Sequence, residues 1–489
     1  MMQNLISQYQ KLSLCQYGGR FFRYVIFVLY LISLPAVAAP VQKLTLNRAF
    51  ELALELNEDE KIRAEELEIA EARYYQALSN YFPQLSLFYS KQYRDKLDRS
   101  RTVTSDAASL SQQLRAIEMG TYLYQYTGSN ETRAQQNPDQ AGVSFTWPLF
   151  SGFRTYHQSK SADSLKLSKQ ELNQRQRQLL FRDIAEVFYQ TIQYSESEKI
   201  YKEEEQALKV RIAEVGRFVG LGRSPQGDLL LARSDLANSL VEAQTNRALL
   251  EASKELLSFL IGRSTTQYEL VDEQLAPKPD ELEIYLSRVE ERKDLTAALQ
   301  NIRAAQAELQ GARGGYLPDV TLDGAYLMQQ HTDSGRDWNV TLRVTLPIFQ
   351  GGATMAEVRE AKSNLRISEL QLDRLRRLAN YEIRQSYVDY TSSAASLLLL
   401  RENVATAQLA FAVQQRDYRL GLVTNLEVLN SLNRYHKSRL ALVRTESLLK
   451  INQLRLHVAA GYDLKPDLEN KQTEPTTDQD LNQTKDNLK

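Results

Sequence analysis

The sequence predicts a mainly helical chain that also contains four β-strands and repeats its set of elements once. Three observations support this prediction. Apolar residues recur at every seventh position over long stretches, which is typical of coiled coils. Shorter stretches alternate apolar and polar residues, which is typical of strands with one apolar face. Matching proline and glycine motifs also occur in both halves of the 489 residues, which indicates an internal duplication.

The duplication rests on motifs at expected strand ends and turns. Four pairs of positions carry it: Pro83 and Pro318, Pro148 and Pro347, Gly152 and Gly351, and Gly222 and Gly421. The last three pairs are 199 residues apart and the first pair is 235 residues apart. The first half therefore contains 36 additional residues between its two prolines, as one enlarged loop would produce.

The start of the chain reads as an export signal, predicted over residues 1–38. Two arginines precede the apolar run Tyr24–Leu34, and Ala36–Ala38 fits a small-x-small cleavage site. The alternative is a membrane anchor, although the run is short for the ~20 residues that a helical span needs. The single cysteine, Cys15, precedes the run, so the exported chain would contain no thiol, which suits an oxidising compartment. The net charge of −1 gives no indication of nucleic-acid binding.

After the signal, the pattern predicts two repeats, a linker and a tail. The first repeat covers 39–262, the linker 263–279, the second repeat 280–462 and a disordered polar tail 463–489. Each repeat is expected to contain short helices, a strand, a loop, a second strand, a long helix, a tight turn and a returning helix. The expected strands cover 84–93, 141–149, 319–327 and 338–346, and the polar segment 95–140 is expected to be an exposed loop.

The long helices follow from the spacing of proline, glycine and apolar residues. No proline or glycine occurs between Gly352 and Gly421, which leaves room for one helix about 100 Å long at ~1.5 Å per residue. The heptad positions of the two long helices are Leu180, Val187, Tyr194, Tyr201, Leu208 and Val215, and Ile383, Tyr390, Leu397, Val404, Phe411 and Tyr418. A period of 3.5 residues predicts left-handed supercoiling against neighbouring helices.

The four strands predict a membrane location, because their apolar faces need cover. Strand edges left unpaired in lipid would cost several kcal/mol for each group, and closed membrane barrels have about eight strands or more. We therefore expect copies of the chain to share a barrel, and the spacing is compatible with two copies or three. The rings expected at the lipid boundary are Trp147, Trp338, Tyr89, Tyr93 and Tyr326. The alternative is a soluble sandwich whose apolar faces pack together.

The strand-end motifs Trp147–Gly152 and Leu346–Gly351, the glycine-containing hairpin tips and the order of elements resemble the TolC family of outer-membrane efflux and type I secretion channels. The resemblance covers about residues 44–462. It implies a homotrimer in which twelve strands form one transmembrane β-barrel, continued by an α-helical coiled-coil barrel through the periplasm of a Gram-negative bacterium. It also implies a periplasmic adaptor and an inner-membrane pump, of the resistance-nodulation-division (RND) or ABC type, as partners, with no cofactor.

The two hairpin tips, around 219–228 and 420–430, are the expected functional sites. Gly222 and Gly421 are expected to close the helices that precede them. Ser224 is expected to cap the first returning helix, and Thr424 or Asn425 the second.

In a closed ring of copies, each tip residue becomes a ring of like residues. The resemblance places a pore constriction at Glu427 and at Asn430, where the family has a second acidic residue, and Asp228 is expected to contribute to it. The alternative for these residues is a solvated helix start, where carboxylates suit the helix dipole. The residues expected to dock an adaptor are Val219, Gly220, Leu221, Gly222, Gly421, Leu422 and Val423, with packing inside the hairpin as the alternative for the apolar ones.

The sequence gives no indication of catalysis or of a metal site. The four histidines, His157, His331, His436 and His457, have no ligand spacing, and no glycine-rich phosphate loop follows a strand. We therefore expect a passive conduit for exported small molecules or polypeptides, with the energy supplied by a partner. The alternative is a secreted or surface coiled-coil scaffold or adhesin without a pore, whose helices would carry the same heptads.

Overall fold

The computed structural model describes residues 42–91, 139–265, 268–272, 279–330 and 338–462. The expected signal peptide, Tyr93, most of the expected 95–140 loop and the expected tail lie outside these residues. The chain divides into two compact units. The helical unit comprises the described residues of Met1–Ala64, Gln174–Arg292 and Arg377–Lys489, and the sheet unit comprises those of Glu65–Asn173 and Lys293–Arg376.

Helices account for most of the described residues, as the sequence predicts. In chain order the elements are β1 (Gln42–Leu44), α3 (Leu46–Leu56), α4 (Glu58–Ser79), β2 (Gln84–Lys91), β3 (Asp139–Ser151), α6 (Arg154–Gly220), α7 (Gln226–Ile261), β4 (Tyr268–Leu270), α8 (Leu282–Ser287), η1 (Val289–Glu291), α9 (Lys293–Arg313), η2 (Gly314–Tyr316), β5 (Asp319–Gln330), β6 (Trp338–Thr345), α10 (Ala353–Arg419) and α11 (Asn425–Ala459).

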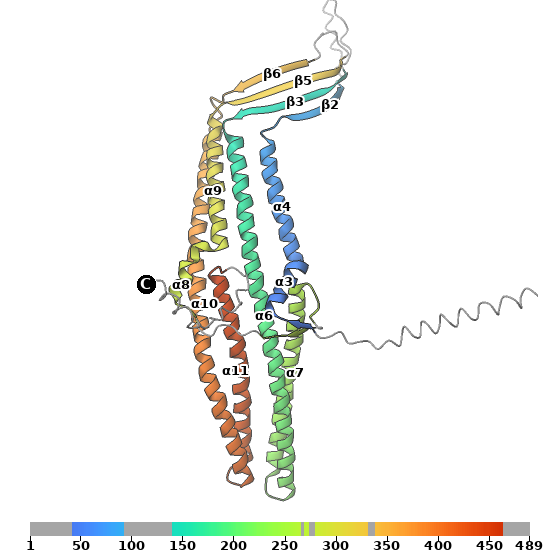
Figure 1. Ribbon diagram of the computed structural model, residues 1–489, viewed down its shortest axis with the longest axis vertical. Helices are drawn as coiled ribbons and strands as arrows, with labels where there is room; N and C mark the ends of the chain where they lie inside the picture. Colours follow the sequence, from blue (N-terminus) through green and yellow to red (C-terminus); the bar gives the residue numbers. More distant parts are fainter. Residues whose placement is uncertain (1–41, 92–138, 266–267, 273–278, 331–337, 463–489) are drawn as a thin grey trace, which may run out of the picture. The chain divides into compact units, whose positions relative to one another are not determined.

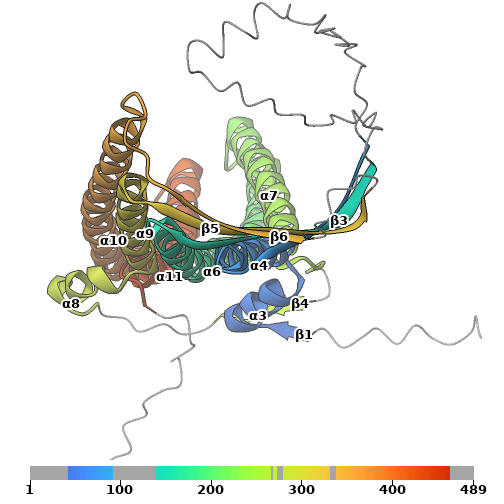
Figure 2. The ribbon, with the colours of Figure 1, turned by 90° about the horizontal axis from the view of Figure 1, so that it is seen from above.

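The sheet unit contains a four-stranded antiparallel sheet with the order β2-β3-β5-β6. Figure 2 shows its strands as one curved band. The register aligns Leu85 with Phe145, Trp147 with Leu322, and Leu322 with Leu342, so apolar residues from all four strands share one face. We call this the apolar face, and the other face carries mainly polar side chains. The strands β2 and β6 form the two edges of the sheet.

The described residues leave the apolar face without cover. Every residue of β6 is exposed, and seven of the eight residues of β2 are exposed. The large apolar side chains that are exposed on the strands and their ends include Leu85, Leu87, Tyr89, Trp147, Tyr326, Trp338, Val340, Leu342 and Val344. A soluble sandwich would have buried these side chains, so its packing is not present in the described residues.

The long helices form as the missing proline and glycine residues predict. Helices α6 and α10 each contain 67 residues, and the helical unit pairs α6 with α7 and α10 with α11 as two hairpins (Figure 1). The expected heptad residues face inward: Leu208, Val215, Ile383 and Tyr390 are almost completely buried, and the others are buried or half-buried. The heptad prediction is therefore confirmed for both long helices.

The main core of the helical unit lies where α3, α6, α7 and α11 meet. Leu46, Ile184, Phe188, Leu257 and Val458 belong to one cluster of buried apolar side chains there. Beside it, β1 and β4 form a short parallel pair that aligns Leu44 with Leu270. The strand β4 lies inside the segment that the sequence suggested as a linker, and at three residues it is too short for a periodic pattern to predict.

Candidate functional site

Both hairpin tips of the helical unit close with the same backbone geometry. Gly222 and Gly421 have φ values of +69° and +78°, in the left-handed region that glycine adopts without strain. The amide after each glycine returns to a carbonyl five residues earlier: Arg223 N to Phe218 O at 2.8 Å, and Leu422 N to Asp417 O at 2.9 Å. This is the Schellman arrangement. The expectation that these glycines close their helices is confirmed.

The second tip carries a complete capping box. Thr424 is the N-cap of α11, which decides between the two expected candidates. The Thr424 amide donates to Glu427 Oε2 at 2.7 Å, and the Glu427 amide donates to Thr424 Oγ1 at 3.4 Å. The Glu427 carboxylate therefore has a structural role at the helix start, and its side chain is exposed at the same time.

The first tip is capped differently from the expectation. Pro225, not Ser224, is the N-cap of α7, and it makes no side-chain capping bond. The Ser224 hydroxyl instead donates to Asp228 Oδ2 at 2.6 Å. Pro225 has an extended backbone, so the helix begins one residue later than predicted, with Asp228 half-buried in its first turn.

The expected constriction residues lie in the first turns of the two returning helices. Glu427 and Asn430 are both exposed near the start of α11, three residues apart and hence on one side of the helix. Asp228 lies on the other hairpin, but its backbone carbonyl accepts a bond from Asn425 Nδ2 at 3.1 Å. Asn425 precedes Glu427 by two residues. The bond from the Asn425 side-chain amide to the Asp228 backbone carbonyl therefore holds the tips that carry Glu427 and Asp228 together.

A buried polar link joins the two hairpins, and the sequence reasoning missed it. Arg211 Nε donates to Asn425 Oδ1 at 2.9 Å and Arg211 Nη1 donates to Glu214 Oε2 at 2.9 Å. Arg419 Nε completes the link from α10, with a bond of 3.2 Å to Glu214 Oε1. The Arg211 guanidinium carbon also lies 3.7 Å from the centre of the Tyr418 ring. We call these residues the inter-hairpin link.

The centre of the inter-hairpin link is shielded from water, whereas Arg419 at its end is exposed. Arg211 is 4% exposed and Asn425 is completely buried. Burial lowers the pKa of the Arg211 guanidinium, against the opposing effects of Tyr418 and Glu214. A sequence signal did exist: Arg211 lies between the heptad residues Leu208 and Val215, where a charged side chain requires a buried polar partner.

The tip residues that were expected to dock an adaptor divide into two groups. Leu221 and Leu422 project from the tips, with 69% and 71% of their surface exposed. Val219 and Val423 pack inside, against the core cluster of Val215, Tyr418 and Val428. Gly220 has open space around its Cα. Of the residues expected to dock an adaptor, the two leucines therefore present the apolar surface for a partner.

The strand-end motifs lie at the boundary between the sheet and its helices. Pro83 precedes β2, Pro318 precedes β5, and Pro347 follows β6, whereas Pro148 lies within β3 opposite Thr321. Gly152 and Gly351 both have a φ of +60°. At Gly152 a Cβ atom would lie 2.3 Å from the Gly314 carbonyl oxygen, so the close packing of two backbones requires glycine there.

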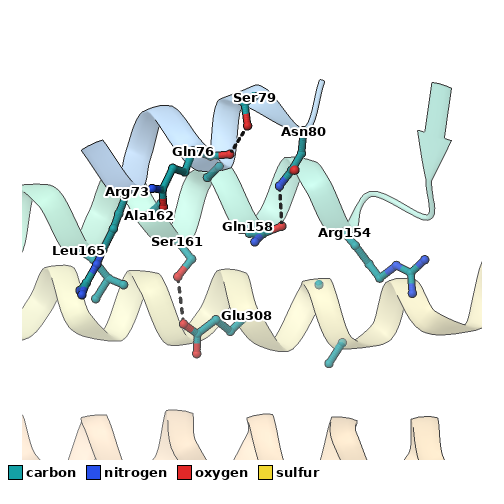
Figure 3. Close-up of a pocket in the computed structure, with 13 residues that line it drawn as sticks. Arg73, Gln76, Ser79, Asn80, Arg154, Gln158, Ser161, Ala162, Leu165 and Glu308 are labelled. Atoms are coloured by element: carbon teal, nitrogen blue, oxygen red, sulfur yellow. Dashed lines mark hydrogen bonds between the residues drawn. The ribbon is translucent and has the colours of Figure 1, made fainter. Parts of the chain in front are cut away.

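A cavity of about 810 Å³ lies in the sheet unit between α4, α6 and α9. Figure 3 shows that its polar side chains bond to one another: Asn80 Nδ2 donates to Gln158 Oε1 at 3.4 Å, and Ser161 Oγ donates to Glu308 Oε1 at 3.0 Å. These bonds tie the three helices together. Ser161 is the lining hydroxyl that bonds to a carboxylate, and the lining contains no histidine that could act as its general base.

Within the described part of the chain, no three His, Cys, Asp or Glu side chains come together where a metal ion could bind. Among the same residues, no helix combines the length and the apolar character that crossing a membrane requires.

The known proteins that this chain is similar to are outer-membrane proteins. The model of the outer membrane efflux protein family matches residues 287–462. The outer membrane efflux protein BepC of Brucella suis is 21% identical over 71% of this chain and 78% of its own length. The outer membrane protein TolC of Escherichia coli is 25% identical over 49% of this chain and about half, 53%, of its own length. Residues 287–462 thus match the outer membrane efflux protein family, and much of the chain is similar to outer-membrane proteins such as BepC and TolC.

Solved structures agree with this assignment at the level of the fold. The outer membrane protein VceC of Vibrio cholerae superposes with a TM-score of 0.72 and 19% identity, over 85% of this chain and 96% of that one. The described chain accordingly has the fold of these outer-membrane channel proteins.

Proposed function

We propose that three copies of this chain form one passive, gated conduit, in which twelve strands close a single barrel and the paired helices continue it as a coiled-coil tunnel. The observation that carries the proposal is a sheet with an uncovered apolar face and two open edges. Successive strands in the order β2-β3-β5-β6 are antiparallel, so β2 and β6 run in opposite directions. The β6 edge of one copy can therefore continue the antiparallel sheet with the β2 edge of the next.

The proposal includes an internal duplication, and one pair of side-chain bonds supports it. Asn57 Nδ2 donates to Leu260 O at the end of α7 at 2.8 Å, and Arg292 Nη1 donates to Ala459 O at the end of α11 at 3.0 Å. The donors are 235 residues apart and the acceptors are 199 residues apart, as in the proline and glycine motifs. Two equivalent hairpins in each chain give six in a trimer, which suits a tunnel wall.

The gate of the conduit would lie at the hairpin tips. Three copies place Glu427 and Asn430 in rings, with Asp228 close by through its bond to Asn425. Rings of carboxylates at a narrow entrance attract cations and repel one another, so they set both conductance and block by divalent cations. Opening would require the hairpins to move apart as a switch between two packings, which breaks the inter-hairpin link.

Planar-bilayer conductance tests the gate. Glu427→Gln removes the charge but keeps an acceptor for the capping box, so we expect higher conductance and weaker block by divalent cations. Thr424→Ala is the matched control, because it breaks the cap at a cost of about 1 kcal/mol and leaves the carboxylate ring in place. Asn430→Asp adds a second ring and should strengthen the block. If Glu427→Gln conducts and is blocked like the wild type, Glu427 is not part of the gate.

The partners would be a periplasmic adaptor and an inner-membrane pump of the RND or ABC type, which supplies the energy. Leu221 and Leu422 are the most exposed apolar groups at the tips, where Leu420 and Leu426 are exposed as well, and would contact the adaptor. Leu221→Ser with Leu422→Ser should lower crosslinking to a co-expressed adaptor and leave bilayer conductance unchanged. Crosslinking at the wild-type level would exclude these two leucines from docking.

A further inference from the structure

The polar face of the sheet carries two large apolar side chains among its described residues, Phe88 on β2 and Leu327 on β5. Both are in register with Gly142 on β3, which lies opposite Phe88 on one side and opposite Leu327 on the other. Side chains alternate along a strand. Ser86 and Ser144, each two residues away and opposite one another, therefore share this face. The two exceptions to the polar pattern thus meet at one point of the sheet.

The register between β3 and β5 places Leu327 on the polar face. It shifts between Ala141 and Gly142 and again between Pro148 and Phe150, and it is regular between these two shifts. A bulge changes which side chains face each other across two strands. Gly142 begins the regular stretch, so Gly142 and Leu327 lie on the same face as the polar side chains that follow them in the register.

The Phe88 ring leans across the glycine. A Cβ atom at Gly142 would lie 3.2 Å from Cζ of the Phe88 ring. Leu327 approaches the same position with its Cα, also at 3.2 Å. Gly142 is buried, whereas Phe88 and Leu327 are half-buried. The Leu327 side chain is thus not needed to cover the glycine, and it extends the apolar surface that the ring begins. We call Phe88 and Leu327 the polar-face patch.

A second ring covers a glycine on the apolar face, and the contrast is informative. Phe145 lies opposite Gly324, where a Cβ atom would be 2.3 Å from Cε1 of the Phe145 ring. That ring has apolar neighbours on its own face. Serines flank Phe88 on its face of β2. Covering a glycine explains a ring at either site, but it does not explain why Leu327 adds apolar surface on the polar face.

Neither lipid nor a second copy covers the polar-face patch in the proposed barrel. Lipid lies against the opposite, apolar face. The β6 strand of the next copy would lie beside β2, because these strands are the two edges of the sheet. On the polar face, the described residues of β6 present an amide, two hydroxyls and a guanidinium, from Asn339, Thr341, Thr345 and Arg343. The patch is therefore left facing the water of the lumen.

The charged groups of the polar face lie nearer the helices and are paired with one another. Asp323, four residues before Leu327, lies 3.8 Å from Arg343. Asp319 pairs with Arg154 at the start of α6. The side chains that surround the polar-face patch are serines and alanine, which carry no charge. A molecule that binds there would be held by apolar contact and not by its charge.

We infer that Phe88 and Leu327 form a contact site for the apolar ring of a cargo molecule in the lumen of the barrel. The inference rests on the proposed conduit and adds a cargo class, small molecules that carry an aromatic ring. Aromatic pairs prefer offset or edge-to-face contacts of modest strength. Modest strength suits a conduit, because cargo must leave its sites as well as enter them. Three copies would present three such sites around one lumen.

Single tryptophan reporters test the site. The chain contains two tryptophans, so Trp147→Phe with Trp338→Phe gives the background. Phe88→Trp keeps an aromatic ring in the polar-face patch. Thr321→Trp is the matched control, on the same face of an inner strand but six residues before Leu327. Leu87→Trp, the neighbouring position on the apolar face, reports on insertion of the sheet into lipid.

The first measurement locates the patch in phosphatidylcholine vesicles. We expect acrylamide to quench the Phe88→Trp and Thr321→Trp reporters and brominated lipid to quench the Leu87→Trp reporter. If lipid does not quench Leu87→Trp, the proposed barrel itself is wrong. If lipid quenches Leu87→Trp but the Phe88→Trp reporter is protected from both quenchers, the barrel stands. The ring is then covered by protein, which overturns the inference.

The second measurement uses 4-nitrobenzyltrimethylammonium, whose nitroaromatic ring quenches tryptophan on contact, with tetramethylammonium as the control of equal charge without a ring. We expect saturable quenching of the Phe88→Trp reporter, about three- to tenfold stronger than that of Thr321→Trp, as one aromatic contact provides. Leu327→Ser should weaken the quenching of Phe88→Trp, and tetramethylammonium should quench neither reporter. Equal quenching of both reporters, or quenching of Phe88→Trp that Leu327→Ser leaves unchanged, would overturn the inference.

Discussion

In the helical unit, heptad residues such as Leu208 and Ile383 are completely buried by other parts of the same chain, whereas in the sheet unit every residue of β6 is exposed. Both regions carry apolar residues at regular spacing, but only the helical unit buries them within the chain. Burying a leucine contributes roughly 1.5–3 kcal/mol, and the helical unit gains this contribution within one chain. The sheet gains it only from lipid and from sister copies. The comparison explains how one sequence can encode a coiled coil with a seam that is buried within the chain and an incomplete barrel wall.

The largest expected effect comes from a charge on the apolar face of the sheet. Leu342→Arg would place a guanidinium in lipid at a cost of about 2–4 kcal/mol in each copy, so we expect assembly into vesicles to fail. The matched control is Thr341→Arg, one residue earlier and on the polar face, which should assemble. Heat-modifiable migration in gels measures assembly. Equal behaviour of the two variants would contradict the assignment of the faces.

The second largest effect is expected from Leu208, a residue in the apolar seam of the helical unit. Leu208 packs with Ala232, Leu429 and Leu432, and Leu208→Ala should lower the free energy of unfolding by about 2–5 kcal/mol. Val210→Ala, two residues later on an exposed part of α6, should change it by less than about 0.5 kcal/mol. Chemical denaturation measures both. A large effect of Val210→Ala would instead show that a sister copy covers this side of α6.

The inter-hairpin link should contribute less than the seam. Asn425→Ala leaves Arg211 Nε and the Asp228 carbonyl without their partner in a buried site. We expect a loss of about 3 kcal/mol, because one of the two lost bonds involves a charged group. Asn430→Ala, on the exposed side of the same helix, is the control and should be close to neutral. Equal stability of the two variants would show that the inter-hairpin link does not stabilise the protein.

The smallest of the four effects depends on pH. His436 is 3% exposed on α11, and burial, followed by the charge of Arg439, lowers its pKa from 6.5 to about 4, with Glu203 opposing. The unfolded chain binds a proton below pH 6.5 and the folded chain does not, so stability is lost as the pH falls from 6.5 towards 4. At pH 5 the loss is about 2 kcal/mol.

His436→Gln isolates this term from other groups. Burial raises the pKa values of Glu204 and Asp235, so these groups stabilise the fold as the pH falls and oppose His436. The difference in unfolding free energy between wild type and His436→Gln, measured at pH 7 and at pH 5, cancels the two carboxyl groups. A difference that does not change with pH would show that His436 is accessible to protons in the folded protein.

The sequence predicts elements whose signal is periodic or carried by proline and glycine. The seam of α10, the alternating strands and the closing glycines at Gly222 and Gly421 all have signals of this kind. The inter-hairpin link has a weaker sequence signal. Arg211 and Asn425 are 214 residues apart, and a single charged residue in the seam does not indicate which residue it bonds to. The bulge before Phe150 and the pair β1–β4 depend on tertiary contacts, so no local pattern predicts them. The number of copies in a barrel has no local pattern either.

The mass of the purified protein tests the central statement that sister copies complete the sheet. Native mass spectrometry of the detergent-solubilised protein should give three chain masses, which corresponds to twelve strands. Unfolding in stronger detergent should then abolish the three-chain species and the bilayer conductance together. A protein that conducts nothing and has the mass of a single chain, while it retains its helices, would contradict the account.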